Sequence, residues 1–119
     1  MRYYNLKHKI FRHGDVDGRE IESIPSTAKL LDTKTVAYGE VTGHHHTFSG
    51  QVLVYQPIQG QTIKIGGEDI PVQKYIEVKE DSVLIHQEHN QIVVQKGVYA
   101  ILQEREWNPF EHQIRKVLD

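Results

Sequence analysis

The residues in this chain whose types and spacing suit chemistry are its histidines. The sequence holds eight of them, with His44, His45 and His46 consecutive and His86 and His89 close together further along. Histidine is the commonest metal ligand in proteins, and its side chain exchanges protons most readily near neutral pH. Two dense histidine groups in one short chain therefore point to a metal site or to acid–base chemistry.

Strand geometry decides which members of the triplet can act together. If the β-branched run before the triplet continues through it, alternation places His44 and His46 on one face and His45 on the other. A His-x-His pair on one face lets two imidazole rings converge without backbone strain. We therefore expect His44 and His46, rather than His45, to be metal ligands.

The second histidine group follows a β-type run and lies in a turn-like sequence. His86 closes the run and His89 comes just after it, and a tight turn can direct two such residues to the same side. We expect both to be ligands. Glu88 is a candidate ligand or a group that orients a ligand ring by accepting its outer N–H, and Asp15 and His13 are further candidates for a supporting role.

Four neutral imidazole nitrogens suit several divalent metals. Ligation without thiols is compatible with Zn²⁺, Fe²⁺, Mn²⁺, Ni²⁺ or Cu²⁺, and the ligand types do not identify which of these metals is bound. Three histidines with a water molecule form the open type of site found in metalloenzymes, whereas four protein ligands form the closed type that stabilises a fold. The sequence leaves both possibilities open.

Two other interpretations of the histidines also stay open. Paired histidines on facing strands can serve as general acid and general base in phosphodiester cleavage, and the segment His45-His46-Thr47 matches the His-x-Thr half of such a site. The sequence has no second His-x-Thr motif, so we rank this interpretation below metal binding. The histidines can also be plain polar residues of solvated loops.

The composition excludes several classes of function. The chain has no cysteine, which rules out disulfides, thiolate zinc sites, iron–sulfur clusters and a cysteine nucleophile. The net charge is −2 and the basic residues are scattered, so nucleic-acid binding is not expected. The sequence shows no apolar signal region and no run near the roughly 20 apolar residues of a membrane helix. We expect a soluble, cytoplasmic protein with no membrane partner, and a virion as the alternative location.

Short β-type runs separated by glycine, proline, aspartate and asparagine recur along the chain. They cover residues 35–42, 51–55, 62–65, 75–78, 83–85, 92–94 and 98–102. A spacing of about ten residues leaves no room for helical crossovers between parallel strands. The pattern predicts a single all-β domain over 1–119, a barrel or sandwich of about seven to nine antiparallel strands.

Other elements are predicted towards the ends of the chain. Residues 9–12 and 19–22 favour edge strands, and residues 26–31 favour one helical turn. Near the C-terminus, Asn108 is a good N-cap and Pro109 suits the first helical position. Apolar residues then follow at helical spacing, which predicts a short C-terminal helix, with a strand as the alternative.

The order of these motifs resembles a family of small uncharacterised proteins from bacteria and phages. The family pattern runs HGDV, GEVTGHxH, HxEH and PGxYxxxxQREY, and the chain resembles it at 13–16, 39–46, 86–89 and 97–107. The chain departs from this pattern in three places. HGDV runs into Asp-Gly-Arg rather than an apolar strand, Trp107 replaces the last tyrosine, and the stretch of residues 57–81 is longer than in the family pattern.

That resemblance implies that the four predicted ligands belong to shared motifs and that His45 does not, and it implies no activity. A weaker resemblance is to cupin barrels, which hold a metal with a His-x-His pair and a later histidine. Cupins also place a glutamate a few residues after the pair, and here residues 47–50 are Thr-Phe-Ser-Gly instead.

The sequence therefore predicts a β-domain that binds a divalent metal through His44, His46, His86 and His89. We prefer a non-enzymatic binding or assembly module, such as a phage-encoded accessory or virion protein, that works through a protein partner or self-association. A metal-dependent, cupin-like enzyme is the alternative. Such an enzyme would need a free carboxylate as its base. Glu88 and Asp15 are the only candidates that lie near the histidines in the sequence.

Overall fold

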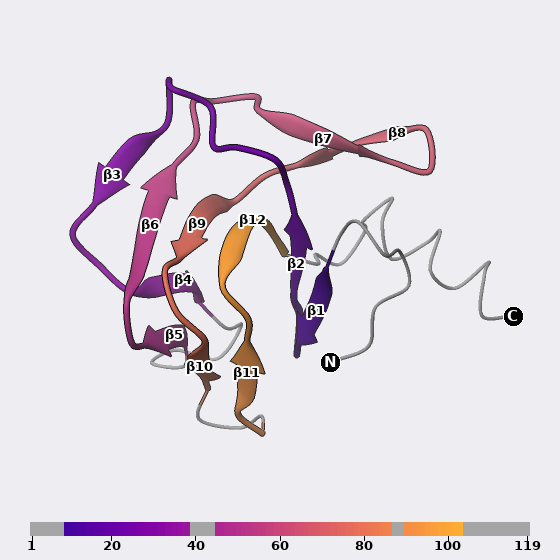
Figure 1. Cartoon of the computed structure of the whole chain (residues 1–119). Coiled ribbons are helices and arrows are strands. Elements are labelled where there is room, and N and C mark those ends of the chain that lie inside the picture. The colour runs from indigo at the N-terminus through magenta and orange to yellow at the C-terminus, as the bar shows by residue number, and fades with distance from the viewer. Residues whose placement is uncertain (1–8, 39–44, 87–89, 104–119) are drawn as a thin grey trace, which may run out of the picture.

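The computed structural model describes residues 9–38, 45–86 and 90–103, and the regular elements in these residues are twelve β-strands (Figure 1). The strands are β1 (Ile10–His13), β2 (Val16–Glu20), β3 (Lys29–Leu31), β4 (Thr35–Tyr38), β5 (His45–Ser49), β6 (Val52–Gln56), β7 (Thr62–Ile65), β8 (Glu68–Pro71), β9 (Lys74–Val78), β10 (Ser82–Ile85), β11 (Ile92–Val94) and β12 (Gly97–Gln103). Within these described ranges, no helix is long and apolar enough to cross a membrane.

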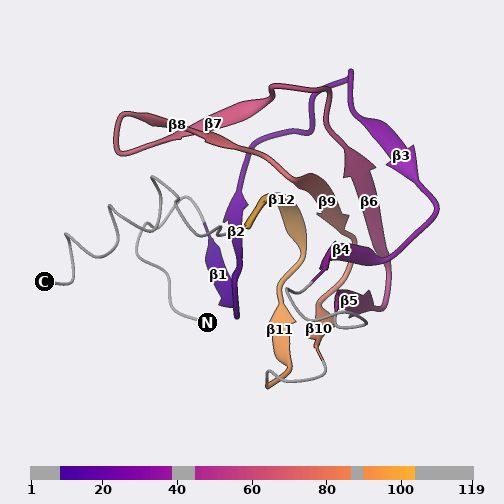
Figure 2. The same cartoon turned by 180° about the vertical axis from the view of Figure 1, so that it is seen from behind.

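The strands form two main antiparallel sheets and a separate hairpin, which Figure 2 shows from behind. The larger sheet has the order β1-β2-β12-β9-β6-β3, and the smaller sheet has the order β11-β10-β5-β4. Among the described strands, β7 pairs only with β8. The predicted all-β class is therefore confirmed. The two sheets do not close into a barrel, and their arrangement is that of a sandwich.

The main core joins both sheets through side chains that alternate along each strand. The buried members of this core come from nine strands: Phe11, Val16, Val36, Ala37, Phe48, Val52, Val54, Ile76, Val78, Leu84, Val94, Tyr99 and Ile101. Strand β12 is buried on both faces, because Tyr99 and Ile101 face this core while Ala100 and Leu102 face a second cluster. A strand that is apolar on both faces suits a central position, and β12 lies between β2 and β9.

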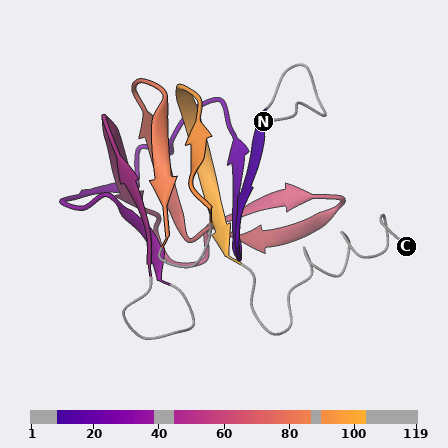
Figure 3. The same ribbon diagram turned by 90° about the horizontal axis from the view of Figure 1, so that it is seen from below.

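The second cluster lies on the opposite face of the larger sheet, where the β7–β8 hairpin contributes Ile70, Ile63 and Ile65. Figure 3 shows this hairpin extending to the side of the other strands. Its turn is Gly66-Gly67, whose φ angles of 58° and 85° suit glycine.

Three sequence predictions differ from the structure. The run from residue 35 does not continue through the histidine triplet, because β4 pairs antiparallel with β5 and Tyr38 lies opposite His45. Residues 29–31 form strand β3 against β6 rather than part of a helical turn. The strand predicted at 19–22 is β2, which starts at Val16 and lies inside the sheet. The predicted C-terminal helix lies outside the described residues.

Gly18 in β2 lies directly opposite Phe11 in β1, and the Phe11 ring covers it. A Cβ atom at Gly18 would stand 2.0 Å from Cε2 of Phe11, and the ring also makes an edge-on contact with Tyr99 at 5.4 Å between centroids. We expect Gly18→Ala to destabilise the fold by about 1–3 kcal/mol, since the buried ring must leave its position. Urea denaturation measures this, and Phe11→Leu in the Gly18→Ala background should restore part of the loss. An unchanged urea midpoint in the single variant would contradict this packing.

Candidate functional site

Three buried histidines from separate elements meet at one end of the sandwich. His13 ends β1, His46 lies in β5 and His86 directly follows β10, and their exposed fractions are 3%, 0% and 7%. The ring centroids of His46 and His86 are 4.3 Å apart, those of His13 and His46 are 5.0 Å apart, and those of His13 and His86 are 6.3 Å apart. Residues far apart in the sequence thus form one group.

Alternation along β5 sets the direction of His46. His46 and Phe48 are buried, whereas His45 and Thr47 on the other face are half-buried. The register of β4 against β5 shifts near Val36, where an extra β4 residue forms a bulge next to the His46 pair. The structure therefore places His46 inward and His45 on the opposite face, as alternation predicted. The two residues lie in the separate strand β5, however, and not in a continuation of β4.

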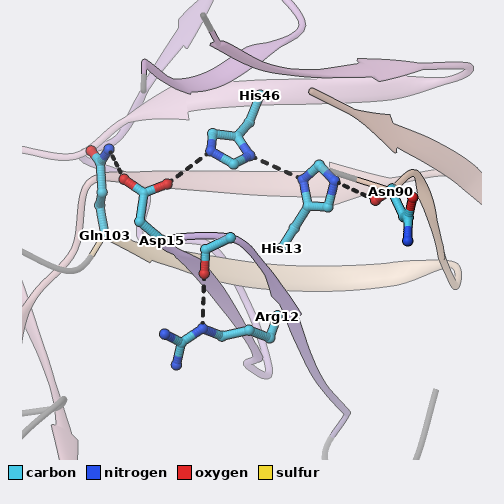
Figure 4. Close-up of polar contacts among 7 residues, drawn as sticks. Arg12, His13, Asp15, His46, Asn90 and Gln103 are labelled. Carbon is cyan, nitrogen blue, oxygen red and sulfur yellow. Dashed lines mark hydrogen bonds and ion pairs between the residues drawn. The ribbon is translucent and has the colours of Figure 1, made fainter. Parts of the chain in front are cut away.

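The β1–β2 turn brings His13 and Asp15 to the same place. Gly14 at this turn has a φ of 62°, which glycine adopts without strain. Arg12 braces the turn by donating from Nε to the main-chain oxygen of Gly14 at 3.0 Å. His13 and Asp15 then both face His46, which comes from the other sheet (Figure 4).

A continuous chain of polar contacts runs through these side chains (Figure 4). Nδ1 of His13 lies 3.0 Å from Nδ1 of His46. Nε2 of His46 lies 2.9 Å from Oδ1 of Asp15, and Nε2 of Gln103 donates to Oδ2 of the same carboxylate at 2.9 Å. At the other end, Nε2 of His13 lies 2.8 Å from the main-chain oxygen of Asn90.

The surroundings set the charges of this chain. Burial lowers the pKa of His46 to about 4, although the hydrogen bond and the negative charge of Asp15 act to raise it. Burial acts to raise the pKa of Asp15, but its hydrogen bonds with Gln103 and His46 outweigh that effect, and the pKa lies below its usual value. At neutral pH, Asp15 is therefore a carboxylate and His46 is neutral.

The two ends of the chain determine where the imidazole protons lie. The Asn90 carbonyl and the Asp15 carboxylate only accept hydrogen bonds, so Nε2 of His13 and Nε2 of His46 must donate to them. In neutral imidazoles this leaves both Nδ1 atoms with lone pairs, which face each other at 3.0 Å. A proton shared by the two rings, or a metal ion bound to both Nδ1 atoms, would balance these lone pairs.

The structure brings together only part of the predicted ligand set. His46 and His86 lie side by side, and His13, predicted in a supporting role, contacts His46 directly. The predicted ligands His44 and His89 and the neighbouring Glu88 lie outside the described residues. Among the residues that the structure does describe, no set of three or more histidine, aspartate or glutamate side chains is arranged to hold a metal ion.

Sequence reasoning missed two contributors to the site. Gln103 ends β12 and fixes the Asp15 carboxylate, and its only signal in the sequence is its place in the last segment that resembles the family pattern. Asn90 acts through its main-chain oxygen, which no residue type reveals. Asp15 was predicted to orient a histidine, and the structure places it against His46.

Two surface crevices lie away from the histidines. One, of about 350 Å³, is lined by residues 77–79 and 96–98, and the other, of about 450 Å³, is lined by residues 56–62 and 71–73. Neither contains a member of the polar chain, so the buried histidines do not open into either crevice.

The geometry defines the class of this protein. It is a sandwich of two antiparallel sheets with a buried histidine–carboxylate chain at one end. The chain belongs to the family described as "Domain of unknown function (DUF8820)", whose model matches residues 12–104. The matched range contains every residue of the polar chain, and it agrees with the predicted membership of an uncharacterised family. No curated protein and no solved structure matches the chain.

Proposed function

We propose that this protein is a non-enzymatic β-domain that binds a divalent metal ion through Nδ1 of His13 and Nδ1 of His46. The observation that carries the proposal is the 3.0 Å contact between Nδ1 of His13 and Nδ1 of His46. Burial lowers the pKa of His46 to about 4, so the His46 ring itself carries no positive charge at neutral pH. A bound cation would supply positive charge between the two Nδ1 atoms, and neutral imidazole is the form that binds metals.

The contacts on the outer nitrogens support the same proposal. A histidine that ligates a metal almost always donates its other ring N–H to a carboxylate, a main-chain carbonyl or water, which fixes its tautomer and orientation. His46 meets a carboxylate and His13 meets a main-chain carbonyl in this way. Both rings are therefore held with Nδ1 directed to a common point.

Further ligands are needed to complete such a site. His86 is the next candidate, because its ring lies 4.3 Å from that of His46 between centroids. His44 and His89 remain proposed ligands on the strength of the sequence alone. A set of imidazoles without thiolates suits Zn²⁺, Fe²⁺, Mn²⁺ or Ni²⁺.

Burial favours a structural ion over a catalytic one. A metalloenzyme keeps a coordination position that substrate can reach, whereas the three rings here are at most 7% exposed. The ion would link the β1–β2 turn of the larger sheet to β5 of the smaller sheet, in a chain that has no cysteine to form a disulfide. The protein would then act by binding a protein partner or another copy of itself. A bacterial or phage-infected cytoplasm, or a virion, is its proposed location.

Elemental analysis of protein purified without a histidine tag tests the proposal. We expect about one divalent ion per chain, and a lower unfolding temperature after the ion is removed with a chelator. Returning the metal at about 100 times its dissociation constant should stabilise the fold by about 2.7 kcal/mol. A metal content near zero, with no change in unfolding temperature when Zn²⁺, Fe²⁺, Mn²⁺ or Ni²⁺ is added, would refute it.

A further inference from the structure

We infer that the larger of the two crevices described above binds a neutral saccharide. This crevice, of about 450 Å³, lies at the base of the β7–β8 hairpin, where Thr62 begins β7 opposite Pro71 at the end of β8 (Figure 1). Its volume is within the range of about 300–1,000 Å³ that is usual for small-molecule sites. No member of the polar chain lines the crevice, so the inference is independent of the proposed metal site.

Uncharged amides dominate the polar lining of the crevice. Of the ten described residues that line it, none has an ionisable side chain, and four are glutamines: Gln56, Gln59, Gln61 and Gln73. A charged ligand would find no opposite charge among these residues to replace its water. A glutamine amide both donates and accepts hydrogen bonds, as a hydroxyl group does. The lining therefore suits an uncharged ligand that is rich in hydroxyl groups.

The glutamines differ in how they are held. The side chain of Gln61 forms a hydrogen bond with that of Tyr75, which is only 2% exposed, so a buried residue fixes this amide in position. Within the described part of the chain, no hydrogen bond engages the side-chain amides of Gln59 and Gln73. These two amides can therefore bond to a ligand in place of water.

Apolar side chains provide the second kind of surface that a sugar ring needs. Ile58 lines the crevice and is 52% exposed, and Pro57 and Pro71 lie in the same lining. The C–H groups on one face of a sugar ring can pack against such side chains through dispersion contacts. A bound sugar would also remove the exposed Ile58 side chain from water.

The main chain of the crevice argues against a peptide that adds a strand. Strand addition depends on free main-chain hydrogen-bonding groups. Two lining residues, Pro57 and Pro71, have no N–H group. Three others already donate their main-chain N–H to main-chain oxygens: Gln61, Val72 and Gln73. Side chains must therefore supply most of the recognition, which favours a hydroxylated small molecule.

Titration of the ¹⁵N-labelled full chain, followed by NMR, tests this inference. The probes are D-glucose, D-galactose, D-mannose and N-acetyl-D-glucosamine. At least one of them should shift the side-chain amide signals of Gln59 and Gln73, with a dissociation constant of about 1–10 mM, as expected for so small a ligand. Glucose 6-phosphate should bind at least about tenfold more weakly than glucose, because its phosphate meets no positive charge in the lining.

Three variants locate the binding. Gln59→Ala and Gln73→Ala should each weaken it about three- to tenfold, the effect of losing one hydrogen bond to the ligand. Gln51→Ala is the matched control, because Gln51 is an exposed glutamine that does not line the crevice. This variant should bind the sugar as the natural chain does. Gln59 is also exposed, so its replacement should leave the fold intact.

Three results would overturn the inference. The first is that none of the four sugars shifts these amide signals at about 100 times the millimolar scale expected for binding. The second is sugar binding that Gln59→Ala and Gln73→Ala leave unchanged, which would place the sugar elsewhere. The third is a shift of the same signals by N-acetyl-trialanine amide and by none of the sugars, which would assign the crevice to a peptide.

Discussion

His46→Ala is expected to abolish metal binding, whereas His45→Ala leaves it intact. The two residues are adjacent and identical in type, but His46 is fully buried in the polar chain and His45 lies half-buried on the opposite face of β5. Loss of His46 removes one of the two facing Nδ1 atoms and the donor to Oδ1 of Asp15, while Gln103 still donates to Oδ2. The pair therefore isolates the effect of position from the effect of deleting an imidazole.

The same two variants should differ in stability. Truncating a fully buried side chain to alanine leaves a cavity and typically costs about 2–5 kcal/mol, and His46 is 0% exposed. For His45→Ala we expect a loss of less than about 1 kcal/mol, as for most substitutions of partly exposed residues. Urea denaturation and equilibrium dialysis against Zn²⁺ measure the two effects. Equal metal content in the two variants would contradict the role given to His46.

Asp15→Asn should weaken metal binding about 10–100-fold while the fold stays intact. The Asp15 carboxylate accepts the Nε2 proton of His46 and thereby leaves Nδ1 with a lone pair. An asparagine amide can instead donate to Nε2, which places the imidazole proton on Nδ1 and blocks that atom as a ligand. The expected change is therefore one of tautomer, in a side chain of nearly the same size.

Asp69→Asn is the matched control for that variant. Asp69 lies on the β7–β8 hairpin, where it pairs with Lys64 at 2.9 Å, and its side chain is 59% exposed. Exposed ion pairs of this kind contribute little to stability, so this variant should bind metal like the natural chain. Competition against a metal-sensitive dye gives both dissociation constants. Equal constants for Asp15→Asn and Asp69→Asn would show that Asp15 does not control the His46 tautomer.

Local pattern was enough to predict most strands. Alternation and turn residues located residues 62–65 and 92–94 as strands with the observed bounds. The same reasoning missed β8, because its first residues, Glu68 and Asp69, favour turns and only pairing with β7 makes them a strand. It also predicted a helical turn where β3 forms, since the pairing of β3 with β6 joins segments that are distant in sequence.

The candidate site shows the same limit more clearly. The inward direction of His46 followed from alternation, which is a local property. The contact between His13 and His46 spans 33 residues, and the contact between His13 and Asn90 spans 77. Neither can be derived from spacing, because both depend on how the β1–β2 turn packs against the other sheet. For that reason the sequence predicts only a supporting role for His13, whereas the structure places it in contact with His46.

The most direct test of the metal site is ¹⁵N NMR of the histidine side chains, recorded on the Zn²⁺-loaded and metal-free forms of the untagged protein. Our account predicts that His13 and His46 keep their protons on Nε2 in the loaded form, and that both Nδ1 resonances shift to metal-bound positions. Metal-free protein should lose those shifts. Identical spectra in the two forms, with a proton shared between the two Nδ1 atoms, would contradict the metal site and assign the positive charge to an imidazolium instead.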